Sequence, residues 1–288
     1  MLYQVLLSTR PRQWVKNLFV LAALVFSRHL FEWHYALKAA AAALCFCGLS
    51  GGIYLVNDLF DREQDARHPS KRLRPVASGA LSTRAAGAAA ALLLPLSLAA
   101  SFYLGGAFGA IAVAYTAINL AYSYRLKRLV LVDILIVASG FLIRAVAGAV
   151  VIEVVISTWF ILCSFTLALF LAAVKRRQEL VKLEDAAAEH RPALEEYGVP
   201  YLDQVISVLT SATLVCYCLY AMGVGEGGAR GMEWTIPFVL YGMLRYLYLV
   251  YRRESGDSPT AIVWQDRPLQ VALILWLAAS LAGLHLRG

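Results

Sequence analysis

Nine long apolar runs, each of close to twenty residues, constrain the fold of this chain more than any other feature of its sequence. An α-helix needs about 20 consecutive apolar residues to cross the hydrocarbon core of a bilayer. We therefore predict an all-α polytopic membrane protein with nine transmembrane helices, formed as a single transmembrane domain over residues 1–288. The expected helices occupy residues 15–31, 36–58, 83–103, 105–124, 129–150, 155–175, 203–222, 234–252 and 266–286.

Composition and charge agree with this prediction, because 60% hydrophobic and 16% charged residues exclude an ordinary soluble domain. The net charge of +7 does not indicate nucleic-acid binding, since the basic residues lie in short loops between the apolar runs. Most of the 26 Lys and Arg residues fall at the N-terminus and after the second, fourth, sixth and eighth runs, so these parts should face the cytoplasm. We expect an integral protein of the cell (inner) membrane without a removable signal peptide.

A cluster of acidic residues closes the second apolar run. In a helix, Asn57, Asp61 and Asp65 are spaced at i, i+4 and i+8, and Asp58 lies one turn before Asp61, so their oxygens converge on one face. Carboxylates at the C-terminal end of a helix repel one another and the helix dipole, so a cation should be present. Mg²⁺, which prefers oxygen ligands and often shares them with substrate phosphates, is the expected ion.

An alternative is that this cluster is a solvated helix end whose carboxylates pair with Arg62 and Arg67. The loop that follows, residues 62–82, is basic and contains prolines, and it could close over a polyanionic substrate as a lid. Arg72 in this loop is a candidate for contact with phosphate. Further along the chain, the polar stretch 176–202 is expected to form an amphipathic cytoplasmic segment.

Basic residues in and beside the apolar runs are further candidates for the site. Arg144 lies well inside the fifth run, about three helical turns from Asp133, and should face a polar cavity or a partner, although a purely structural ion pair is an alternative. Lys16, beside an interfacial tryptophan, either anchors the first helix or binds phosphate. Lys175 and Glu179 are one turn apart and either pair with each other or contact phosphate and metal separately.

The acidic cluster carries a resemblance to a known family. The pattern Asn57-Asp58-x-x-Asp61-x-x-x-Asp65, followed by Arg74-Pro75 and Ser78-Gly79, resembles the motif of the UbiA superfamily of intramembrane transferases. Other motifs, up to about residue 202, look like those of its decaprenyl-phosphate phosphoribosyltransferase branch. These motifs are Arg10-Pro11-x-Gln13-Trp14-x-Lys16-Asn17, Tyr122-Ser123-x-x-Leu126-Lys127, Asp133 with Phe141-Leu142-Ile143-Arg144-Ala145, and Lys175-Arg176 with Glu179-Leu180.

This resemblance implies a UbiA-type helix bundle with a central cavity that opens to the cytoplasmic side. It implies magnesium-dependent transfer of 5-phosphoribosyl from 5-phosphoribosyl 1-diphosphate to a polyprenyl (decaprenyl) phosphate, a step toward cell-wall arabinan. The partners would be these two substrates and the membrane, and a homo-oligomer is compatible with the resemblance. The catalytic residues would be Asp58, Asp61 and Lys175, the metal ligands Asp58, Asp61 and Asp65, and the substrate-binding residues Lys16, Asn57, Arg72, Tyr122, Lys127, Arg144 and Arg176.

One part of the chain departs from the superfamily pattern. Most members have a second aspartate-rich motif after the sixth helix, where this chain reads Lys175-Arg176-Arg177-Gln178-Glu179. One acid among three cations suits anionic oxygen better than a second metal shell, as a donor with several phosphates requires. Two other functions stay open: a prenyltransferase that moves a prenyl group from a prenyl diphosphate to an aromatic ring or another alcohol, and a transporter. We find no paired broken helices, which argues against the transporter.

Overall fold

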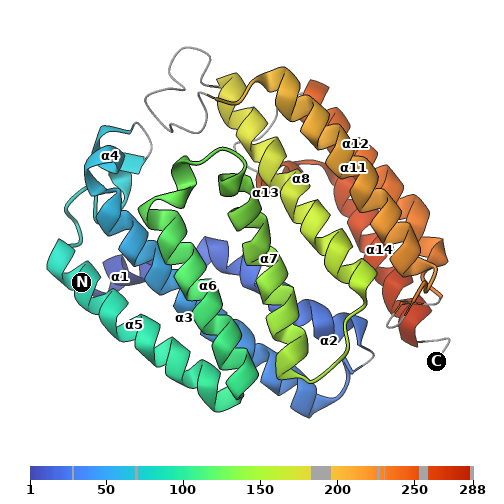
Figure 1. Cartoon of the computed structure of the whole chain (residues 1–288), viewed down its shortest axis with the longest axis horizontal. Helices are drawn as coiled ribbons and strands as arrows, with labels where there is room; N and C mark the ends of the chain where they lie inside the picture. The colour runs from blue at the N-terminus through green and yellow to red at the C-terminus, as the bar shows by residue number, and fades with distance from the viewer. Residues whose placement is uncertain are drawn as a thin grey trace. The chain divides into compact units, whose positions relative to one another are not determined.

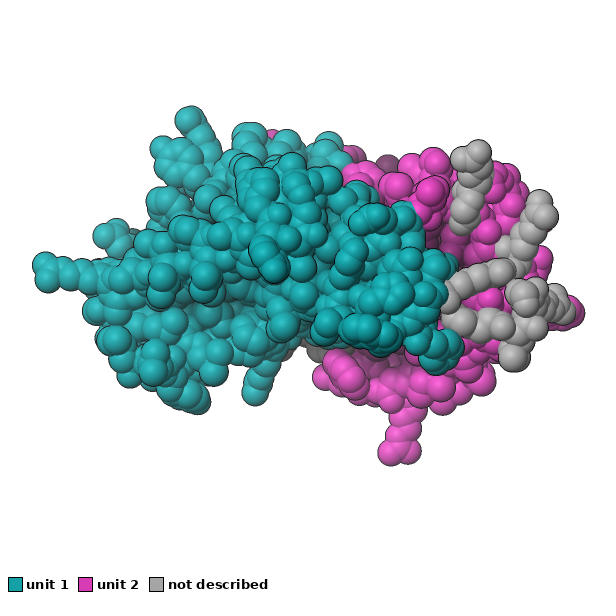
Figure 2. All heavy atoms as spheres, turned by 90° about the horizontal axis from the view of Figure 1, so that it is seen from below, with its two compact units in different colours: residues 1–136, 143–154 teal, residues 137–142, 155–288 magenta. Residues whose placement is uncertain are grey.

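The computed structural model describes the chain except residues 28, 69–70, 183–195, 226–227, 230, 253–258 and 286–288. All regular secondary structure in the described residues is helical, which confirms the predicted all-α class (Figure 1). The chain divides into two compact units, one made of Met1–Ile136 and Ile143–Val154 and the other of Val137–Leu142 and Val155–Gly288 (Figure 2). The middle of the amphipathic segment expected at 176–202 lies outside the described residues.

The first unit contains the helix that ends at the acidic cluster. Its elements are α1 (Leu2–Ser8), the 3₁₀ helix η1 (Pro11–Leu21), α2 (Ala22–Phe26), α3 (Trp33–Phe60), α4 (Arg62–Arg67), η2 (Lys71–Leu73), α5 (Thr83–Leu104), α6 (Gly106–Tyr124), η3 (Leu126–Arg128) and most of α7 (Val132–Val151). The second unit contains the rest of α7, α8 (Thr158–Lys182), α11 (Val199–Ala221), η4 (Glu233–Thr235), α12 (Ile236–Arg252), α13 (Pro259–Gln265) and α14 (Arg267–His285).

Seven helices within the described residues are long and apolar enough to cross a membrane: α3, α5, α6, α7, α8, α11 and α14. They match seven of the nine predicted runs. The first predicted run, residues 15–31, is divided between η1 and α2 instead of forming one helix. The eighth run, residues 234–252, corresponds to α12, which is 17 residues long and carries two arginines. Helix length and composition thus support seven of the nine predicted spans, and the orientation in the membrane stays a prediction.

The N-terminal segment departs from a continuous helix at Arg10. The backbone of Arg10 is left-handed, with φ 54° and ψ 65°, and Pro11 then begins the 3₁₀ helix η1. A proline disfavours the α conformation in the residue before it, so α1 cannot continue into η1. A left-handed conformation is unfavourable for any residue with a Cβ and is often found at functional sites. Contacts with the surrounding structure must therefore stabilise the left-handed backbone of Arg10.

Two glycines bring neighbouring segments close to α3. A Cβ at Gly51 would lie 2.9 Å from Thr9 Cβ, and a Cβ at Gly52 would lie 2.6 Å from Leu94 Cγ. Because α3 runs without interruption, these glycines serve close packing rather than a bend. The chain just before Arg10 is thereby held against α3.

The loop between α4 and α5 is anchored in the core of the first unit. Val76 and Leu81 are only 1% and 2% exposed. The buried cluster is completed by Leu55, Ala86 and Ala90. Burial of this much apolar surface fixes the second half of the predicted lid loop. Arg74, two residues before Val76, is consequently set beside the end of α3.

Candidate active site

The acidic cluster lies where α3 ends and α4 begins, and its predicted helical spacing is confirmed. Asp61 N donates to Asn57 O at 2.9 Å and Asp65 N donates to Asp61 O at 2.7 Å, so i to i+4 hydrogen bonds continue across the junction. Asp58 and Asp65 are buried, at 2% and 3% exposure, whereas the Asp61 side chain is 20% exposed. A solvated helix end would expose its carboxylates, so this burial argues against that alternative.

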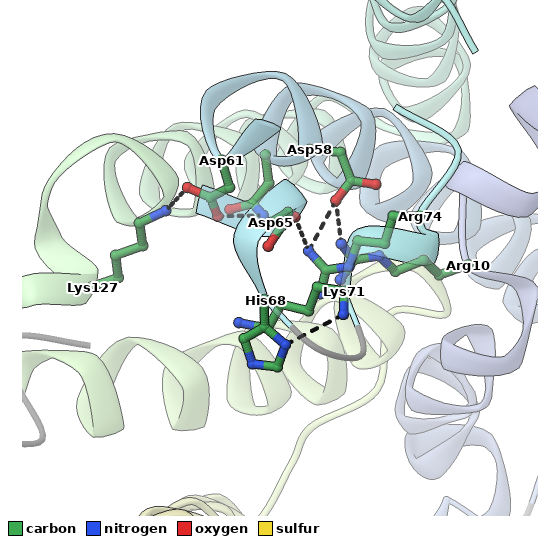
Figure 3. Close-up of polar contacts among 9 residues, drawn as sticks. Arg10, Asp58, Asp61, Asp65, His68, Lys71, Arg74 and Lys127 are labelled. Carbon is green, nitrogen blue, oxygen red and sulfur yellow. Dashed lines mark hydrogen bonds and ion pairs between the residues drawn. The ribbon is translucent and has the colours of Figure 1, made fainter. Parts of the chain in front are cut away.

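Two arginines hold the buried carboxylates. Arg10 Nη2 donates to Asp58 Oδ1, and its guanidinium lies over the Tyr54 ring at 4.6 Å from the centroid. Arg74 Nη1 donates to Asp58 Oδ1 at 3.3 Å and to Asp65 Oδ2 at 2.5 Å, so one guanidinium links two carboxylates (Figure 3). A buried carboxylate needs such a partner, because an isolated ion loses its hydration at a large cost in free energy.

The third carboxylate has a lysine and an amide as partners. Lys127 Nζ, from η3, donates to Asp61 Oδ1 (Figure 3). Asn57 Nδ2 donates to Asp61 Oδ2 at 3.0 Å. The ends of α3 and α6 are brought together by the Phe60 and Tyr124 rings, whose centroids are 6.0 Å apart. The lysine therefore reaches the cluster because two helix ends pack side by side.

The partners of the carboxylates are distant in sequence. Arg10 lies 48 residues before Asp58, Arg74 lies 16 residues after it, and Lys127 lies 66 residues after Asp61. The neighbouring arginines of α4, which the solvated alternative would pair with the cluster, are exposed. The cations that pair with the cluster are thus brought to it by the tertiary structure.

The donor set suits Mg²⁺, because three carboxylates and one amide offer the hard oxygen ligands that this ion prefers. Among the described residues, however, no three acidic, histidine or cysteine side chains lie together closely enough to hold a metal ion. Each carboxylate is instead engaged by at least one cation. A network of ion pairs replaces the predicted convergence of oxygens, so metal binding stays a proposal that requires some of these pairs to open.

The other residues predicted from sequence for the first unit have different surroundings. Lys16 is half-buried on η1, Tyr122 is half-buried near the end of α6, and Arg72 is exposed on η2. Contact of these three residues with substrate stays a prediction. Asp133, predicted to share a face with Arg144, is buried at the start of α7.

Arg144 is buried in α7, at 6% exposure, and meets polar side chains from two other elements. Its Nε donates to Asn17 Oδ1 at 2.8 Å, and its Nη2 donates to the Tyr115 hydroxyl at 2.6 Å. The Tyr115 ring also lies 4.8 Å from the guanidinium carbon. The prediction that this intramembrane arginine has a partner is therefore confirmed, and an amide and a phenol are among its partners.

The end of α8 belongs to the second unit and is charged in the opposite sense. Arg176 is buried, at 3% exposure, and pairs with Glu179 one turn later. Lys175 Nζ lies 4.0 Å from the same carboxylate, and the Lys175 side chain is 42% exposed. The predicted pair of Lys175 and Glu179 is present, while the closer contact of Glu179 is with Arg176.

Sequence reasoning did not assign the site residues Arg10, Arg74, Asn17 and Tyr115. Three of them stand inside motifs singled out from the sequence, but the residues predicted from the basic loop and the N-terminal segment are Arg72 and Lys16. Charge balance gives a partial signal for the two arginines, because three carboxylates at a buried helix end require a similar number of cations, but it does not identify which cations these are. Tyr115 has no such signal, since it lies within an apolar run.

The fold and the site define a helical membrane protein in which carboxylates and cations meet at the end of one long helix. Such a site suits a phosphate-bearing ligand that arrives with a metal ion. The chain belongs to the UbiA prenyltransferase family, whose sequence model matches residues 17–283. The predicted resemblance to this family is confirmed.

Similar proteins from three bacterial species have the same name. The chain is 37% identical over 292 residues to the decaprenyl-phosphate phosphoribosyltransferase of Mycolicibacterium smegmatis, covering 96% of this chain and 91% of that protein. The Mycobacterium tuberculosis protein of the same name is 37% identical over 276 residues, with coverage of 94% and 91%. That of Corynebacterium glutamicum is 34% identical over 278 residues, with coverage of 94% and 83%. The predicted resemblance to this branch is confirmed as well.

Solved structures show the same fold. A UbiA homolog from Archaeoglobus fulgidus, bound to GPP and Mg²⁺, superposes with a TM-score of 0.74 over 98% of this chain and 99% of that chain, at 19% identity. The apo structure of a UbiA homolog from Aeropyrum pernix K1 gives a TM-score of 0.65 over 92% and 98%, at 18% identity. At sequence identities of 18% and 19%, this similarity shows the fold alone.

Proposed function

We propose that this chain transfers a 5-phosphoribosyl group from 5-phosphoribosyl 1-diphosphate to a polyprenyl phosphate. The observation that carries this proposal is an identity of 34% to 37% with three decaprenyl-phosphate phosphoribosyltransferases over at least 94% of the chain. The products would be diphosphate and polyprenyl-phosphoryl-5-phosphoribose. With a decaprenyl acceptor, the lipid product would serve as a precursor for cell-wall arabinan.

The reaction forms one bond and breaks another at C1 of the ribose. A phosphate oxygen of the lipid attacks C1, and the bond between C1 and the diphosphate oxygen breaks with its electron pair staying on the diphosphate. The lipid phosphate is already ionised near neutral pH, so the protein needs no general base. Catalysis then depends on alignment of the two substrates and on stabilisation of charge on the leaving group.

The acidic cluster is the proposed metal site. Asp58, Asp61 and Asp65 would ligate Mg²⁺, with the Asn57 amide assisting. Bound Mg²⁺ would neutralise the charge on the departing diphosphate. Three carboxylates at one helix end match the hard oxygen ligands that this ion takes.

The cations that now pair with the cluster are the proposed contacts for the diphosphate group. Arg10, Arg74 and Lys127 each donate a hydrogen bond to a carboxylate oxygen. Phosphate oxygen accepts the same charge-assisted hydrogen bonds, so an arriving diphosphate can replace a carboxylate as the partner. Their positions around the carboxylates therefore support a site where metal and diphosphate bind together.

The cations of α8 are the proposed clamp for the 5-phosphate of the donor. Lys175 and Arg176 stand next to each other at this helix end, and the Lys175 side chain is 42% exposed. Charge-assisted donors of this kind suit a second phosphate, whereas a prenyl diphosphate donor offers no phosphate beyond its leaving group. Lys16, Arg72 and Tyr122 are additional proposed substrate contacts.

The proposed setting follows from the two substrates. The donor is a water-soluble polyanion and the acceptor has an apolar tail, so we place the site at the cytoplasmic face of the cell membrane, in a cavity that also opens toward the lipid. The chain acts as one transmembrane domain in this proposal, and assembly into a homo-oligomer is compatible with it.

Purified protein in lipid nanodiscs provides the direct test. The donor, labelled with ³²P at its 5-phosphate, is incubated with decaprenyl phosphate and either Mg²⁺ or EDTA. We expect label in the organic phase only with Mg²⁺, and a product mass equal to the lipid phosphate plus one phosphoribosyl group. Label that stays in the aqueous phase with folded protein, together with prenyl transfer from geranyl diphosphate to an added acceptor, would overturn the proposal in favour of ordinary prenyl transfer.

A further inference from the structure

A buried polar cluster in the first unit joins three elements at one side chain. Asn17, on η1, accepts a hydrogen bond from Arg144 of α7 at 2.8 Å. The Asn17 amide nitrogen donates to Ser50 Oγ and Cys47 Sγ of α3, each at 3.2 Å. Asn17 is 2% exposed, so these contacts are shielded from solvent. One asparagine therefore ties η1 to both α3 and α7.

The contact between η1 and α7 is too close to admit a side chain. Gly148 lies one turn after Arg144, and a Cβ there would be 1.9 Å from the carbonyl oxygen of Val20. Arg144 and Gly148 thus hold η1 at Asn17 and at Val20, three residues apart. The backbone of η1 cannot shift along α7 without losing one of these contacts.

The other end of the same segment carries the residue that reaches the acidic cluster. Arg10 has a left-handed backbone, which a residue with a Cβ adopts only when the surrounding structure holds it. Trp14 Nε1 donates to Thr9 O at 3.2 Å and closes the turn around Arg10. Because η1 follows directly after Arg10, any movement of η1 would change where Arg10 meets Asp58.

We propose that Arg144 is a positioning residue, which fixes η1 through Asn17 so that Arg10 is held against Asp58. This proposal rests on the proposed function, because its kinetic consequence is read from phosphoribosyl transfer, and it gives Arg144 a role other than the substrate contact predicted from sequence. Lysine would keep the charge but not the planar group that donates to Asn17 and Tyr115 together. Arg144→Lys should therefore loosen η1 without removing the positive charge.

A double-mutant cycle separates positioning from direct contact with substrate. Arg144→Lys and Arg10→Gln should each lower kcat/KM for the phosphoribosyl donor by about tenfold, the loss of one charge-assisted contact. If Arg144 acts through Arg10, the double variant should fall no more than about twofold below Arg10→Gln alone. Losses that multiply to about a hundredfold would mean independent roles and would overturn the proposal.

The matched control is Arg245→Lys in the second unit. Arg245 also forms two side-chain hydrogen bonds, with Asp266 Oδ1 at 3.2 Å and Oδ2 at 2.8 Å, and it lies outside the proposed site. Any loss of kcat/KM in Arg245→Lys should multiply with the loss in Arg10→Gln, as expected for independent sites. Coupling to Arg10 as strong as that of Arg144 would show a general loss of structure and would overturn the proposal.

Amide hydrogen exchange gives a readout that does not depend on activity. In purified protein, Arg144→Lys should raise exchange of the η1 amides about tenfold, whereas Arg245→Lys should leave them unchanged. Tyr115→Phe, which removes one hydroxyl, should raise η1 exchange about twofold to fivefold and serves if the lysine variant does not fold. Unchanged η1 exchange in both variants of the cluster would overturn the proposal. A protein without transferase activity would refute the proposed function but not this exchange result, so the two failures are distinguishable.

Discussion

The charged side chains at the ends of α3 and α8 have partners from different parts of the chain. At the end of α3, the three aspartates receive Arg10, Arg74 and Lys127 from positions 48, 16 and 66 residues away. At the end of α8, Lys175 and Arg176 share Glu179, which is four and three residues away. The first arrangement depends on the tertiary fold, and the second is present in any helix with this sequence.

The difference extends to the ligand that each end suits. Three carboxylates and three cations balance at the α3 end, so the charge of a metal ion alone would be uncompensated there, whereas an accompanying diphosphate would offset it. At the α8 end, Lys175 and Arg176 offer charge-assisted donors to an anion, and the Lys175 side chain is 42% exposed. Under the proposed function, the α3 end would bind the metal and the leaving group, and the α8 end would bind a separate phosphate.

The largest effect should come from removing an anionic ligand at the α3 end. Asp61→Asn should lower turnover at least about a thousandfold, because charge stabilisation by a metal ion contributes several kcal/mol. The fold should survive, since Asp61 is partly exposed and asparagine can still accept from Lys127. The labelled-donor assay measures the first effect and circular dichroism the second. Glu63→Gln, an exposed acid on the next turn, is the matched control, and near-normal activity of Asp61→Asn would end the assignment of metal to α3.

A somewhat smaller effect should follow from breaking the long-range pairing. Arg74→Gln removes the guanidinium that links Asp58 and Asp65, so we expect kcat/KM to fall about a hundredfold through loss of two charge-assisted contacts. The melting temperature should also fall by at least about 4 °C, because two buried carboxylates lose a partner. Arg67→Gln, an exposed arginine of α4, controls for general charge. Equal behaviour of the two variants in both measurements would contradict the long-range network.

The α8 end should respond more weakly and only toward one substrate. Lys175→Gln should raise the donor KM about tenfold to thirtyfold, corresponding to about 1.5–2 kcal/mol for one charge-assisted contact, and leave the polyprenyl phosphate KM unchanged. Arginine at this position should restore part of the loss, since it keeps the charge in a different geometry. Arg252→Gln, an exposed cation of α12, is the control. A matching rise in both KM values would show a general electrostatic effect and would remove the clamp from α8.

Local features of the site could be predicted from sequence because short-range geometry sets them. The i, i+4, i+8 spacing of Asn57, Asp61 and Asp65 follows from helical periodicity, and so does the contact of Lys175 with Glu179. Most transmembrane helices could be predicted for the same reason, since length and apolar character alone identify them. The family was recognisable from the motif around the acidic cluster.

The partners of the aspartates could not be predicted, because their positions depend on the packing and backbone conformation of other segments. Arg74 is positioned by the burial of Val76 and Leu81 in the core of the first unit, and Arg10 by a left-handed backbone between α1 and η1. Hydropathy cannot distinguish one apolar helix at 15–31 from the 3₁₀ helix and short α-helix found there. The sequence shows that the aspartates need cationic partners, but it does not identify the residues that supply them.

The last prediction perturbs the protein least and tests whether the two helix ends can serve one reaction. Ser78 follows the α3 end, Glu196 lies beyond α8, and both are exposed positions that polar substitution should alter little. Cysteines at these positions should react with an impermeant maleimide from the cytoplasmic side of oriented vesicles, and each variant should keep activity within about twofold. Val155→Cys, 81% exposed between α7 and α8, should react only from the opposite side, and the unaltered protein reports labelling of its five native cysteines. Labelling of Ser78→Cys and Glu196→Cys from opposite sides would separate the metal end from the phosphate end by a bilayer, and a single donor could not then contact both.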